Sequence, residues 1–416
     1  MNPDRPWLKS YPQGVPATID ADRYRSIPAV FAASVAKYAN RPAYRNFGKE
    51  LTYAEVDELS AQFAAYLLGE LGLKKGDRVA LMMPNCLQYP IATFGTLRAG
   101  LTVVNVNPLY TARELKHQLV DAGVTALVVV DNFGDTVEQV IADTPVKHVV
   151  TTGLGDLLGA KGVIVNFVLK YIKKMVPNYH LKGAVRFRQA LKLGSRHSLP
   201  KVEIDHDDIA FLQYTGGTTG VSKGATLLHR NVLANVLQSE AWAEPAMNNP
   251  ARGGPPEQPI TVCALPLYHI FALTVCCLLG MRQGALVILI PNPRDLPALI
   301  KEVKPYKFTS FPAVNTLYNA LAHHPDFDKL DFSELRVSNG GGMAVTSAVA
   351  KAWLEKTGCP IIEGYGLSET SPSVTCNPGD ATEFSGTIGI PLPSTDVVIL
   401  DDDGNPVPYG TPGEIA

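Results

Sequence analysis

Hydrophobic residues follow two different spacings along the chain, and each spacing predicts a different element. Over residues 53–72 they recur every three or four positions, which predicts a helix, and the short apolar run over residues 78–83 that follows predicts a buried strand. Such alternation of helices and strands predicts parallel sheets covered by helices. The same order returns further along the chain, at 112–122 with 126–130 and at 298–303 with 307–311.

The pattern changes towards the end of the chain. Residues 395–400 and 413–416 have the composition of strands, and the Asp-, Gly-, Asn- and Pro-rich residues between them predict a tight turn. Because the last predicted strand would end at Ala416 with unpaired backbone groups, we expect a truncated chain that lacks a small C-terminal domain. The expected fold is α/β, with two helix-flanked, mostly parallel sheet subdomains over 1–205 and 206–390, the second carrying a phosphate loop, and the start of a small β-barrel over 391–416.

Composition excludes several classes of protein. The chain has 416 residues, a formal net charge of −2 and 18% charged residues, which gives no sign of a nucleic-acid partner. Six cysteines occur without a CxxC pair or a companion histidine cluster, so we expect buried free thiols in a reducing cytoplasm rather than a zinc site. The N-terminus lacks the apolar core of a secretory signal, and no stretch reaches the roughly eighteen uncharged apolar residues that a membrane-spanning helix requires.

The most informative string is YTGGTTGVSKGA, which follows a predicted strand over residues 209–213. Its glycines remove Cβ atoms, so the backbone can fold around a phosphate chain with its N–H groups turned inward, and its hydroxyls and lysine add donors and charge. It differs from the GxxxxGK[ST] of P-loop NTPases, because its lysine follows a serine and precedes a glycine. A flexible turn is the alternative interpretation. The string comprises Tyr214, Thr215, Gly216, Gly217, Thr218, Thr219, Gly220, Val221, Ser222, Lys223, Gly224 and Ala225.

This string and four others resemble the motifs of the acyl-adenylate-forming (ANL, AMP-binding) superfamily, in the family order. The residues of these strings are most similar to those of bacterial long-chain fatty-acid–CoA ligases. The resemblance implies an ATP-dependent enzyme that joins a fatty acid to AMP, releases pyrophosphate and passes the acyl group to coenzyme A, with Mg²⁺ as cofactor. The four further strings are LPLYHIF over 265–271, NGGGM over 339–343, EGYGLSET over 363–370 and GTIGIPLP over 386–393.

The resemblance also implies roles for individual residues. Thr215 and Glu369 would hold Mg²⁺, which suits a hydroxyl and a hard carboxylate, and the loop up to Lys223 would cradle the β- and γ-phosphates. Tyr365 would lie against adenine. With His269, the residues Thr215, Lys223 and Glu369 form the expected catalytic set. The nucleotide-binding set further includes the backbone-approach glycines Gly340, Gly341 and Gly342, together with Glu363, Gly364, Gly366, Leu367 and Ser368.

His269 resembles the family histidine near the acyl tunnel, where it would orient the carboxylate or line the entrance, whereas an isolated histidine would more simply pack in the core. The apolar runs over 271–279 and 311–318 suit tunnel walls, and core packing explains them equally well. Ser368 stands where the family usually has threonine. The residues expected to bind the ribose and complete catalysis would lie beyond Ala416, so we expect this chain to bind ATP incompletely and to form adenylate and thioester slowly.

Residues 157–196 contain nine Lys or Arg and no acid. A helix over 163–175 would be amphipathic. It would suit the inner face of a membrane, into which fatty acids partition, and would equally suit packing on the domain with a solvated basic face; docking the phosphates of coenzyme A is a third use. The apolar face would comprise Val163, Ile164, Phe167, Val168, Tyr171, Ile172 and Met175, and the opposite face Asn166, Lys170, Lys173 and Lys174.

Other functions fit parts of the sequence. A ligase for another carboxylate, such as an aryl or medium-chain acid, or one that passes its adenylate to a carrier protein, would share the motifs. A non-catalytic nucleotide or acyl-CoA sensor would keep the fold, although the presence of Lys223 and Glu369 disfavours it, and an interaction protein would need the motif set to be coincidental. Since the similar long-chain enzymes are commonly homodimers, a homodimer is also expected.

Overall fold

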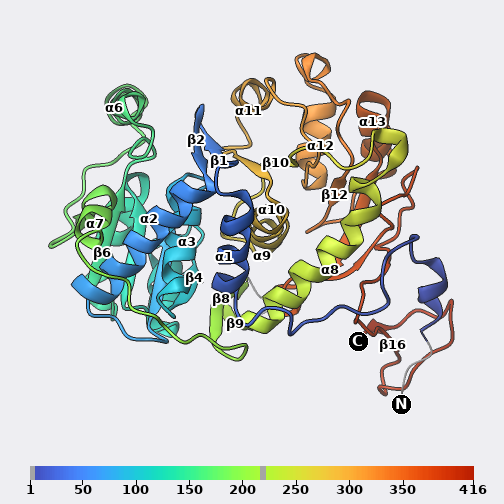
Figure 1. The fold of residues 1–416 in the computed structure, drawn as a ribbon, viewed down its shortest axis with the longest axis horizontal. Coiled ribbons are helices and arrows are strands. Elements are labelled where there is room, and N and C mark those ends of the chain that lie inside the picture. Colours follow the sequence, from blue (N-terminus) through green and yellow to red (C-terminus); the bar gives the residue numbers. More distant parts are fainter. Residues whose placement is uncertain (1–4, 216–221) are drawn as a thin grey trace.

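The computed structural model describes residues 5–215 and 222–416, which fold into sheets and helices arranged side by side along the long axis of the molecule (Figure 1). Helices cover the sheets, and the predicted α/β class is confirmed.

The first sheet has seven strands in the order β7-β6-β5-β3-β4-β8-β9. Every neighbouring pair is parallel except β8 and β9, which form an antiparallel hairpin at one edge. The strands β3 and β5 are buried along almost their whole length, which explains why their sequences are continuously apolar. The bounds are β3 (Arg78–Met82), β4 (Thr102–Asn105), β5 (Ala126–Val130), β6 (His148–Thr152), β7 (Val185–Arg186), β8 (Ile209–Thr215) and β9 (Lys223–Leu228).

The helices of this sheet begin at clear sequence signals. Thr52 and Thr111 each cap a helix, and a glutamate three residues later returns a hydrogen bond to the cap backbone, a reciprocal pair that satisfies two free N–H groups. The predicted helices over 53–72 and 112–122 are confirmed. The bounds are α2 (Tyr53–Ala65) with the π-helical turn η2 (Tyr66–Glu70), α3 (Gln88–Arg98), α4 (Ala112–Asp121), η3 (Asp131–Phe133), α5 (Gly134–Glu138), η4 (Ile141–Asp143), α6 (Ala160–Phe167) with the π-helical turn η5 (Val168–Ile172), and α7 (Phe187–Gly194).

The second sheet is assembled from distant parts of the chain, in the order β10-β11-β1-β2, and single parallel bridges through Ser310 connect it to a third sheet, β12-β13-β14-β15. The sheets do not divide at residue 205. The strands β8 and β9 follow that residue but join the first sheet, and β1 and β2 precede it but join the second. The subdomain limits at residues 205 and 390 stay a prediction. The bounds are β1 (Pro42–Asn46), β2 (Lys49–Thr52), β10 (Ile260–Cys263), β11 (Leu286–Leu289), β12 (Ser338–Gly340), β13 (Ile361–Gly366), β14 (Ser373–Cys376) and β15 (Ile390–Pro391).

One helix of this half is longer than its sequence suggests. The composition of residues 244–259 predicts a loop, but α8 continues to Met247 with Pro245 inside it, because Trp242, Ala246 and Met247 are buried. The bounds are η1 (Pro6–Ser10), α1 (Ile27–Tyr38), α8 (His229–Met247), η6 (Pro250–Arg252), α9 (Ile270–Ala272), the π-helical η7 (Leu273–Leu278), α10 (Leu279–Gln283), α11 (Leu296–Val303), α12 (Asn315–Ala322), η8 (Phe327–Lys329), α13 (Ser347–Thr357) and η9 (Ser368–Thr370).

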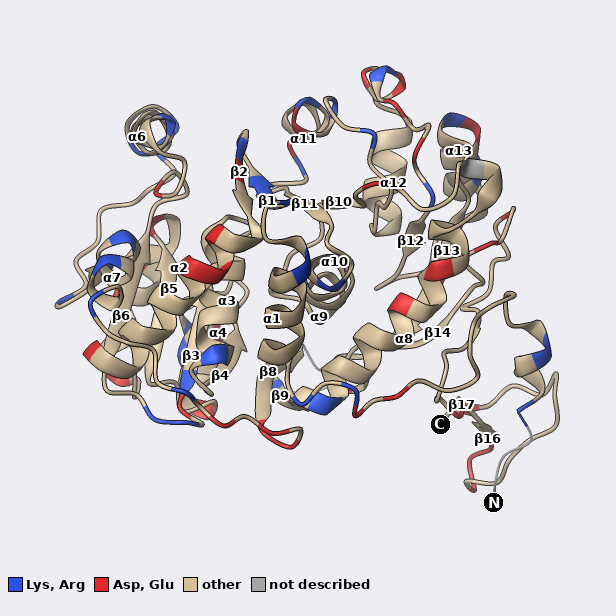
Figure 2. Cartoon of the chain, in the orientation of Figure 1, with Lys and Arg blue, Asp and Glu red and all other residues tan. Residues whose placement is uncertain are grey.

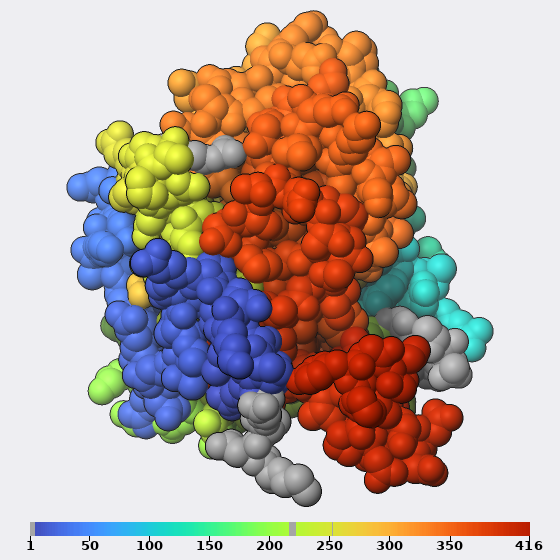
Figure 3. Space-filling model, turned by 90° about the vertical axis from the view of Figure 1, so that its right-hand side faces the viewer, coloured from blue at the N-terminus to red at the C-terminus, as the bar shows by residue number. Residues whose placement is uncertain are grey.

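The end of the chain forms the predicted hairpin, in which β16 (Ile399–Leu400) pairs antiparallel with β17 (Glu414–Ile415). These two strands form an open ribbon, and no closed barrel occurs within the part of the chain that the structure describes. The N-terminal segment packs beside this end of the chain (Figure 3): Arg5 pairs with Asp396 at 2.5 Å, and the Tyr11 hydroxyl donates to the Pro391 carbonyl at 2.7 Å.

The core is continuous between the sheets, since a single apolar cluster joins α1, α2 and α3 to strands of the first and second sheets. All six cysteines are free and buried within it and its neighbouring clusters, as predicted. Burial raises the pKa of Cys86, Cys277 and Cys376 to about 12, so these thiols stay protonated and unreactive at neutral pH. Among the described residues, no helix has the length and apolar character needed to span a bilayer.

A buried histidine makes stability depend on pH. Burial lowers the pKa of His229 to about 4, and its Nδ1 accepts the Ile27 N–H at 3.2 Å, so the folded state holds the neutral ring. The unfolded chain binds this proton with a pKa of about 6.5, so stability present above that pH is lost as the pH falls towards 4. Between pH 7 and 5, wild type should lose about 2 kcal/mol more free energy of unfolding than His229→Gln. Urea unfolding at both pH values measures this, and equal losses would contradict it.

Candidate functional site

The hairpin β8–β9 carries the ends of the predicted phosphate loop. Thr215 ends β8 and Lys223 begins β9, and the two residues pair directly across the hairpin. The Ser222 hydroxyl donates to the Thr215 carbonyl at 2.5 Å, and its own carbonyl lies 2.9 Å from the Nε2 of His117 on α4, so the loop leaves and re-enters the sheet at a fixed point. The intervening loop positions lie outside the described residues, namely Gly216, Gly217, Thr218, Thr219, Gly220 and Val221.

Three residues of this string, Tyr214, Gly224 and Ala225, hold the hairpin in place. The Tyr214 side chain is buried in an apolar cluster of the first sheet that includes residues of α4, and its hydroxyl donates to Asp121. Burial raises the pKa of Tyr214. A Cβ on Gly224 would lie 2.8 Å from the Tyr214 ring, so the glycine makes room for the ring. Tyr214, Gly224 and the partly buried Ala225 therefore brace the hairpin.

The motif over residues 363–370 forms the end of β13 and the turn η9. The turn is closed by the Leu367 N–H, which donates to the Thr370 hydroxyl at 2.9 Å and to the Pro372 carbonyl at 3.1 Å. It lies against β8 and β9. The fold thus brings Ser368 and the exposed Glu369 to the hairpin of Thr215 and Lys223, although more than 140 residues separate them in sequence.

The glycine motif over residues 339–343 ends β12, which pairs in parallel with β13 so that Gly340 faces Glu363. Glu363 is buried and accepts the Val345 N–H at 2.8 Å, which ties the segment after the glycines to β13. A Cβ on Gly341 would lie 3.0 Å from the Phe271 ring, and Gly342 has φ +76°, a conformation that favours glycine. Glu363 and Gly340 therefore shape the backbone and lie behind the surface that the other glycines present.

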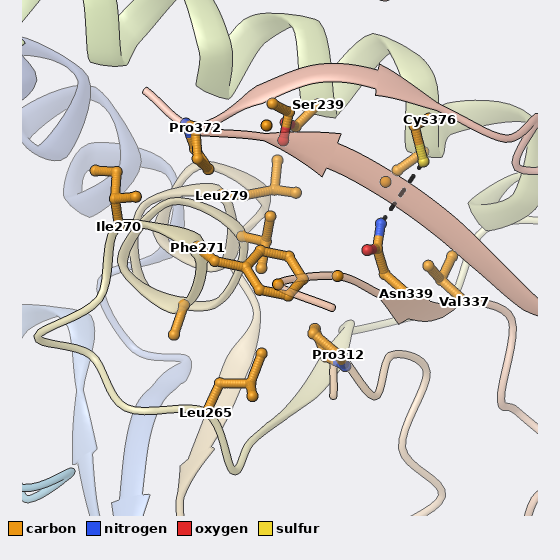
Figure 4. Close-up of a pocket in the computed structure, with 18 of the residues that line it drawn as sticks. Ser239, Leu265, Ile270, Phe271, Leu279, Pro312, Val337, Asn339, Pro372 and Cys376 are labelled. Carbon is orange, nitrogen blue, oxygen red and sulfur yellow. Dashed lines mark hydrogen bonds between the residues drawn. The ribbon is translucent and has the colours of Figure 1, made fainter. Parts of the chain in front are cut away.

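A cavity of about 420 Å³ opens beside these backbones. Its walls come from α8, the helical run from α9 to α10, β12, β13 and β14, and Figure 4 shows apolar side chains such as Phe271, Leu279 and Pro312 turned towards one space. Both apolar runs predicted as tunnel walls contribute lining residues. The predicted site residues that line the cavity are His269, Gly341, Gly342, Gly364, Tyr365, Gly366, Leu367 and Ser368.

Polar side chains such as Ser239, Thr261 and Asn339 lie among the apolar ones that line the cavity. The Asn339 amide nitrogen lies 3.8 Å from the Cys376 sulfur (Figure 4), and its Oδ1 is buried without a hydrogen-bond partner among the described residues. A buried acceptor without a partner is costly, so it is suited to receive a donor from a bound molecule.

His269 caps the start of α9 and lines the cavity. The residue is exposed, and partial desolvation by the protein around it lowers the pKa of His269. The ring is therefore neutral at pH 7 and offers one N–H donor and one acceptor. His269 therefore lies at the cavity and outside the closed core, and its role at an acyl tunnel stays a prediction.

A buried amide network, which no sequence motif indicates, supports the segment that carries this histidine. Asn85 donates to the carbonyls of Cys263 and Leu265 at 2.9 and 2.8 Å and accepts the Leu267 N–H at 2.8 Å. Gln213 continues the support, since its amide donates to the Tyr268 carbonyl at 2.6 Å. The available signal is a set of amide residues at the carboxyl ends of neighbouring parallel strands, which meet at one edge of a sheet.

Removing this support is expected to be costly. Asn85→Ala removes three buried hydrogen bonds of the 263–267 segment and takes the acceptor from the Leu267 N–H, while the Cys263 carbonyl keeps the Ile290 N–H at 3.0 Å, so the free energy of unfolding should fall by about 3 kcal/mol. Urea unfolding measures the loss. Asn248→Ala, which removes a hydrogen bond of 3.4 Å to Glu244 at the end of α8, is the control and should change stability by less than about 0.5 kcal/mol. Equal effects of the two variants would contradict the supporting role.

The donor set fits a magnesium ion shared with a bound phosphate chain. Within the described ranges, no cluster of three or more His, Cys, Asp or Glu side chains could hold a metal by itself. Glu369, however, is an exposed carboxylate on the turn η9, which lies against the hairpin that bears Thr215. Two oxygen ligands with the remainder from water and phosphate is the arrangement that Mg²⁺ favours in nucleotide sites.

Comparison with known proteins gives matches over nearly the whole chain. The sequence profile described as AMP-binding enzyme matches residues 31–416. The chain is 54% identical over 410 residues to a long-chain-fatty-acid–CoA ligase of Escherichia coli O6:H1, covering 98% of this chain and 72% of that protein. It is 54% identical over 413 residues to the ligase of the same name from Yersinia pestis, covering 99% and 72%.

A solved structure extends the likeness in fold. The anthranilate CoA ligase AuaEII in complex with anthranoyl-AMP has a TM-score of 0.81 to this chain at 23% identity, over 95% of this chain and 71% of that one. At this identity the match shows a shared fold alone. The chain thus spans about 72% of the length of its curated relatives.

Proposed function

Since this chain belongs to the AMP-binding enzyme family, we propose that it is the nucleotide-binding part of a long-chain fatty-acid–CoA ligase. A carboxylate oxygen of the fatty acid attacks the α-phosphorus of ATP, the bond to the bridging oxygen breaks, and pyrophosphate leaves with the electron pair. The acyl group of the adenylate then passes to the thiol of coenzyme A, and AMP leaves.

Both substrates of the first step are anions, so the site has to neutralise and align them. Lys223 places a positive charge where the phosphate loop re-enters the sheet, and the loop N–H groups bind the β- and γ-phosphates. Thr215 and Glu369 would hold Mg²⁺, which would supply positive charge that screens the phosphates. Tyr365 and the backbone of Gly341 and Gly342 border the adenine and the acyl carboxylate.

The neutral ring of His269 orients the acyl carboxylate without competing for its charge. The acyl chain extends from there along the apolar cavity walls. Each methylene that leaves water contributes about 0.8 kcal/mol, so long chains bind better than short or aromatic acids as far as the cavity accommodates them.

The observation that carries the proposal is the apolar cavity of about 420 Å³ whose rim is formed by the glycine backbones of β12 and β13, next to the turn that approaches the phosphate hairpin. Identity favours a fatty substrate, since relatives named for long-chain fatty acids match at 54%.

Calorimetry with MgATP and pyrophosphate exchange with oleate, octanoate and benzoate test the proposal. Nucleotide should bind, and exchange with oleate should exceed exchange with benzoate at least about tenfold, which corresponds to burial of only two additional methylenes. A version extended to the full length of the relatives that binds no nucleotide would contradict the proposal, and one that uses benzoate as well as oleate belongs to another substrate class.

The physical state of the substrate bears on where the enzyme works. Because long-chain acids partition into lipid, we propose that the protein is cytoplasmic and binds peripherally to the inner face of the membrane. We also propose that it is a homodimer. Sedimentation equilibrium tests the dimer, and a monomer at micromolar concentration contradicts it.

A further inference from the structure

The helical segment formed by α6 and η5 exposes its apolar side chains. Exposed fractions of 52 to 70% occur at six large apolar residues within thirteen positions, whereas most large apolar side chains of the described chain are buried. We call these six the α6 face. They are Val163, Ile164, Phe167, Tyr171, Ile172 and Met175.

The opposite side of the segment anchors it to the protein. Gly162 is buried so closely that a Cβ would lie 1.8 Å from the Gly155 carbonyl. Asn166, predicted to lie among the lysines, instead turns inward, where it donates to Asp156 at 2.8 Å and accepts the Gly155 N–H at 2.8 Å. A small residue and an amide face the domain, so the apolar side points outward, and packing of this apolar face on the domain is wrong for the described chain.

The surroundings of the α6 face are basic. Lys170, Lys173 and Lys174 are exposed on the same segment, which carries no acid, and the ribbon labelled α6 in Figure 2 shows blue without red. The nearest acids at its base are already paired, because Arg186 binds Asp131 at 2.6 Å and Asp156 at 2.8 Å.

We propose that the α6 face docks on a bilayer that contains anionic lipid. The apolar side chains insert at the boundary between headgroups and acyl chains, and the lysines bind lipid phosphates. The segment projects from the end of the molecule opposite to the β16–β17 ribbon, so it can reach a surface without obstruction (Figure 1). That docking brings the cavity to its lipid-soluble substrate rests on the proposed function; the docking itself does not.

Charge favours a bilayer over a second copy of the chain. In a two-fold symmetric contact the same patch meets itself, so the three lysines of each copy would approach those of the other without an acid between them. Anionic headgroups complement the same charges.

Co-sedimentation with vesicles of phosphatidylcholine, with and without about 30% phosphatidylglycerol as the anionic lipid, tests the proposal. Wild type should bind only the anionic vesicles. The triple variant Lys170→Glu, Lys173→Glu, Lys174→Glu should lower the partition coefficient at least about 100-fold, since each lysine near such a surface contributes about a factor of five. The pair Ile164→Ser, Phe167→Ser should lower it at least about tenfold.

Matched controls keep the charge and apolar changes but move them elsewhere. Lys9→Glu, Lys201→Glu, Lys351→Glu changes three exposed lysines outside the segment, and Val120→Ser, Tyr409→Ser changes two exposed apolar residues. Both control variants should bind vesicles within about threefold of wild type, because charges far from the docking segment act on the bilayer only through screened, long-range attraction.

The outcomes separate the competing occupants. Equal vesicle binding by the α6-face variants and the controls overturns the proposal. If sedimentation equilibrium shows dimers for wild type and the controls but monomers for the α6-face variants, the proposal is also overturned, and the face is a dimer contact. Calorimetry with MgATP without vesicles should give wild-type affinity for every variant, so a failure of docking is distinguishable from a failure of nucleotide binding.

Discussion

Replacing Glu369 by glutamine is expected to slow pyrophosphate exchange by about a thousandfold. The amide keeps the size of the side chain but loses the charge with which, in the proposed function, the carboxylate would hold Mg²⁺ against the phosphates. Exchange of labelled pyrophosphate into ATP with oleate measures the effect, and part of the loss should return as the Mg²⁺ concentration is raised.

Glu355→Gln is the matched control for that change. Glu355 is an exposed glutamate on α13 whose ion-pair partner Lys351 lies 3.9 Å away, a surface pair that contributes little. Its exchange rate should stay within about twofold of wild type. Wild-type exchange by Glu369→Gln would remove the metal role assigned to this residue.

Replacing Gly366 by alanine is expected to destabilise the protein by about 3 kcal/mol and to abolish measurable nucleotide binding. A Cβ at this position would lie 1.8 Å from the Pro372 carbonyl oxygen, and because the obstacle is backbone, the turn that carries Glu369 has to move. Urea unfolding measures the stability, and calorimetry with MgATP measures the binding.

The same strand provides a control for the backbone clash. A Cβ on Gly364, two residues earlier, would meet the Thr375 carbonyl at 3.5 Å, an ordinary contact. Gly364→Ala should therefore cost less than about 1 kcal/mol. If the two alanine variants unfold at the same urea concentration, the close approach of Gly366 to Pro372 does not constrain this turn.

Local sequence was sufficient for the elements whose signals are contained within a few residues. The capping threonines at 52 and 111, the apolar runs that became β3 and β5 and the turn before β17 each predict their own structure, because hydrogen bonds and burial there depend on nearby residues. The motif strings likewise predict neighbours of one cavity, and the fold brings most of them to it.

Other features depend on contacts between residues far apart in the chain, and no local pattern contains them. Three features depend on such distant partners. They are the places of β1 in the second sheet and β8 in the first, the Asn85 network under His269, and the continuation of α8 past Pro245. A helical wheel gives the two faces of the 163–175 segment but not which one meets the protein.

By itself, then, the sequence determined the α/β class, the order of helices and strands and the family of the site, because periodicity and glycine-rich strings act over short distances. The tertiary structure alone decided that Asn166 faces inward and the apolar side chains of α6 face solvent. The physical reason is that the close contact of Gly162 with Gly155 and the paired Asp156 fix the helix from one side, and these partners are known only once the chain has folded.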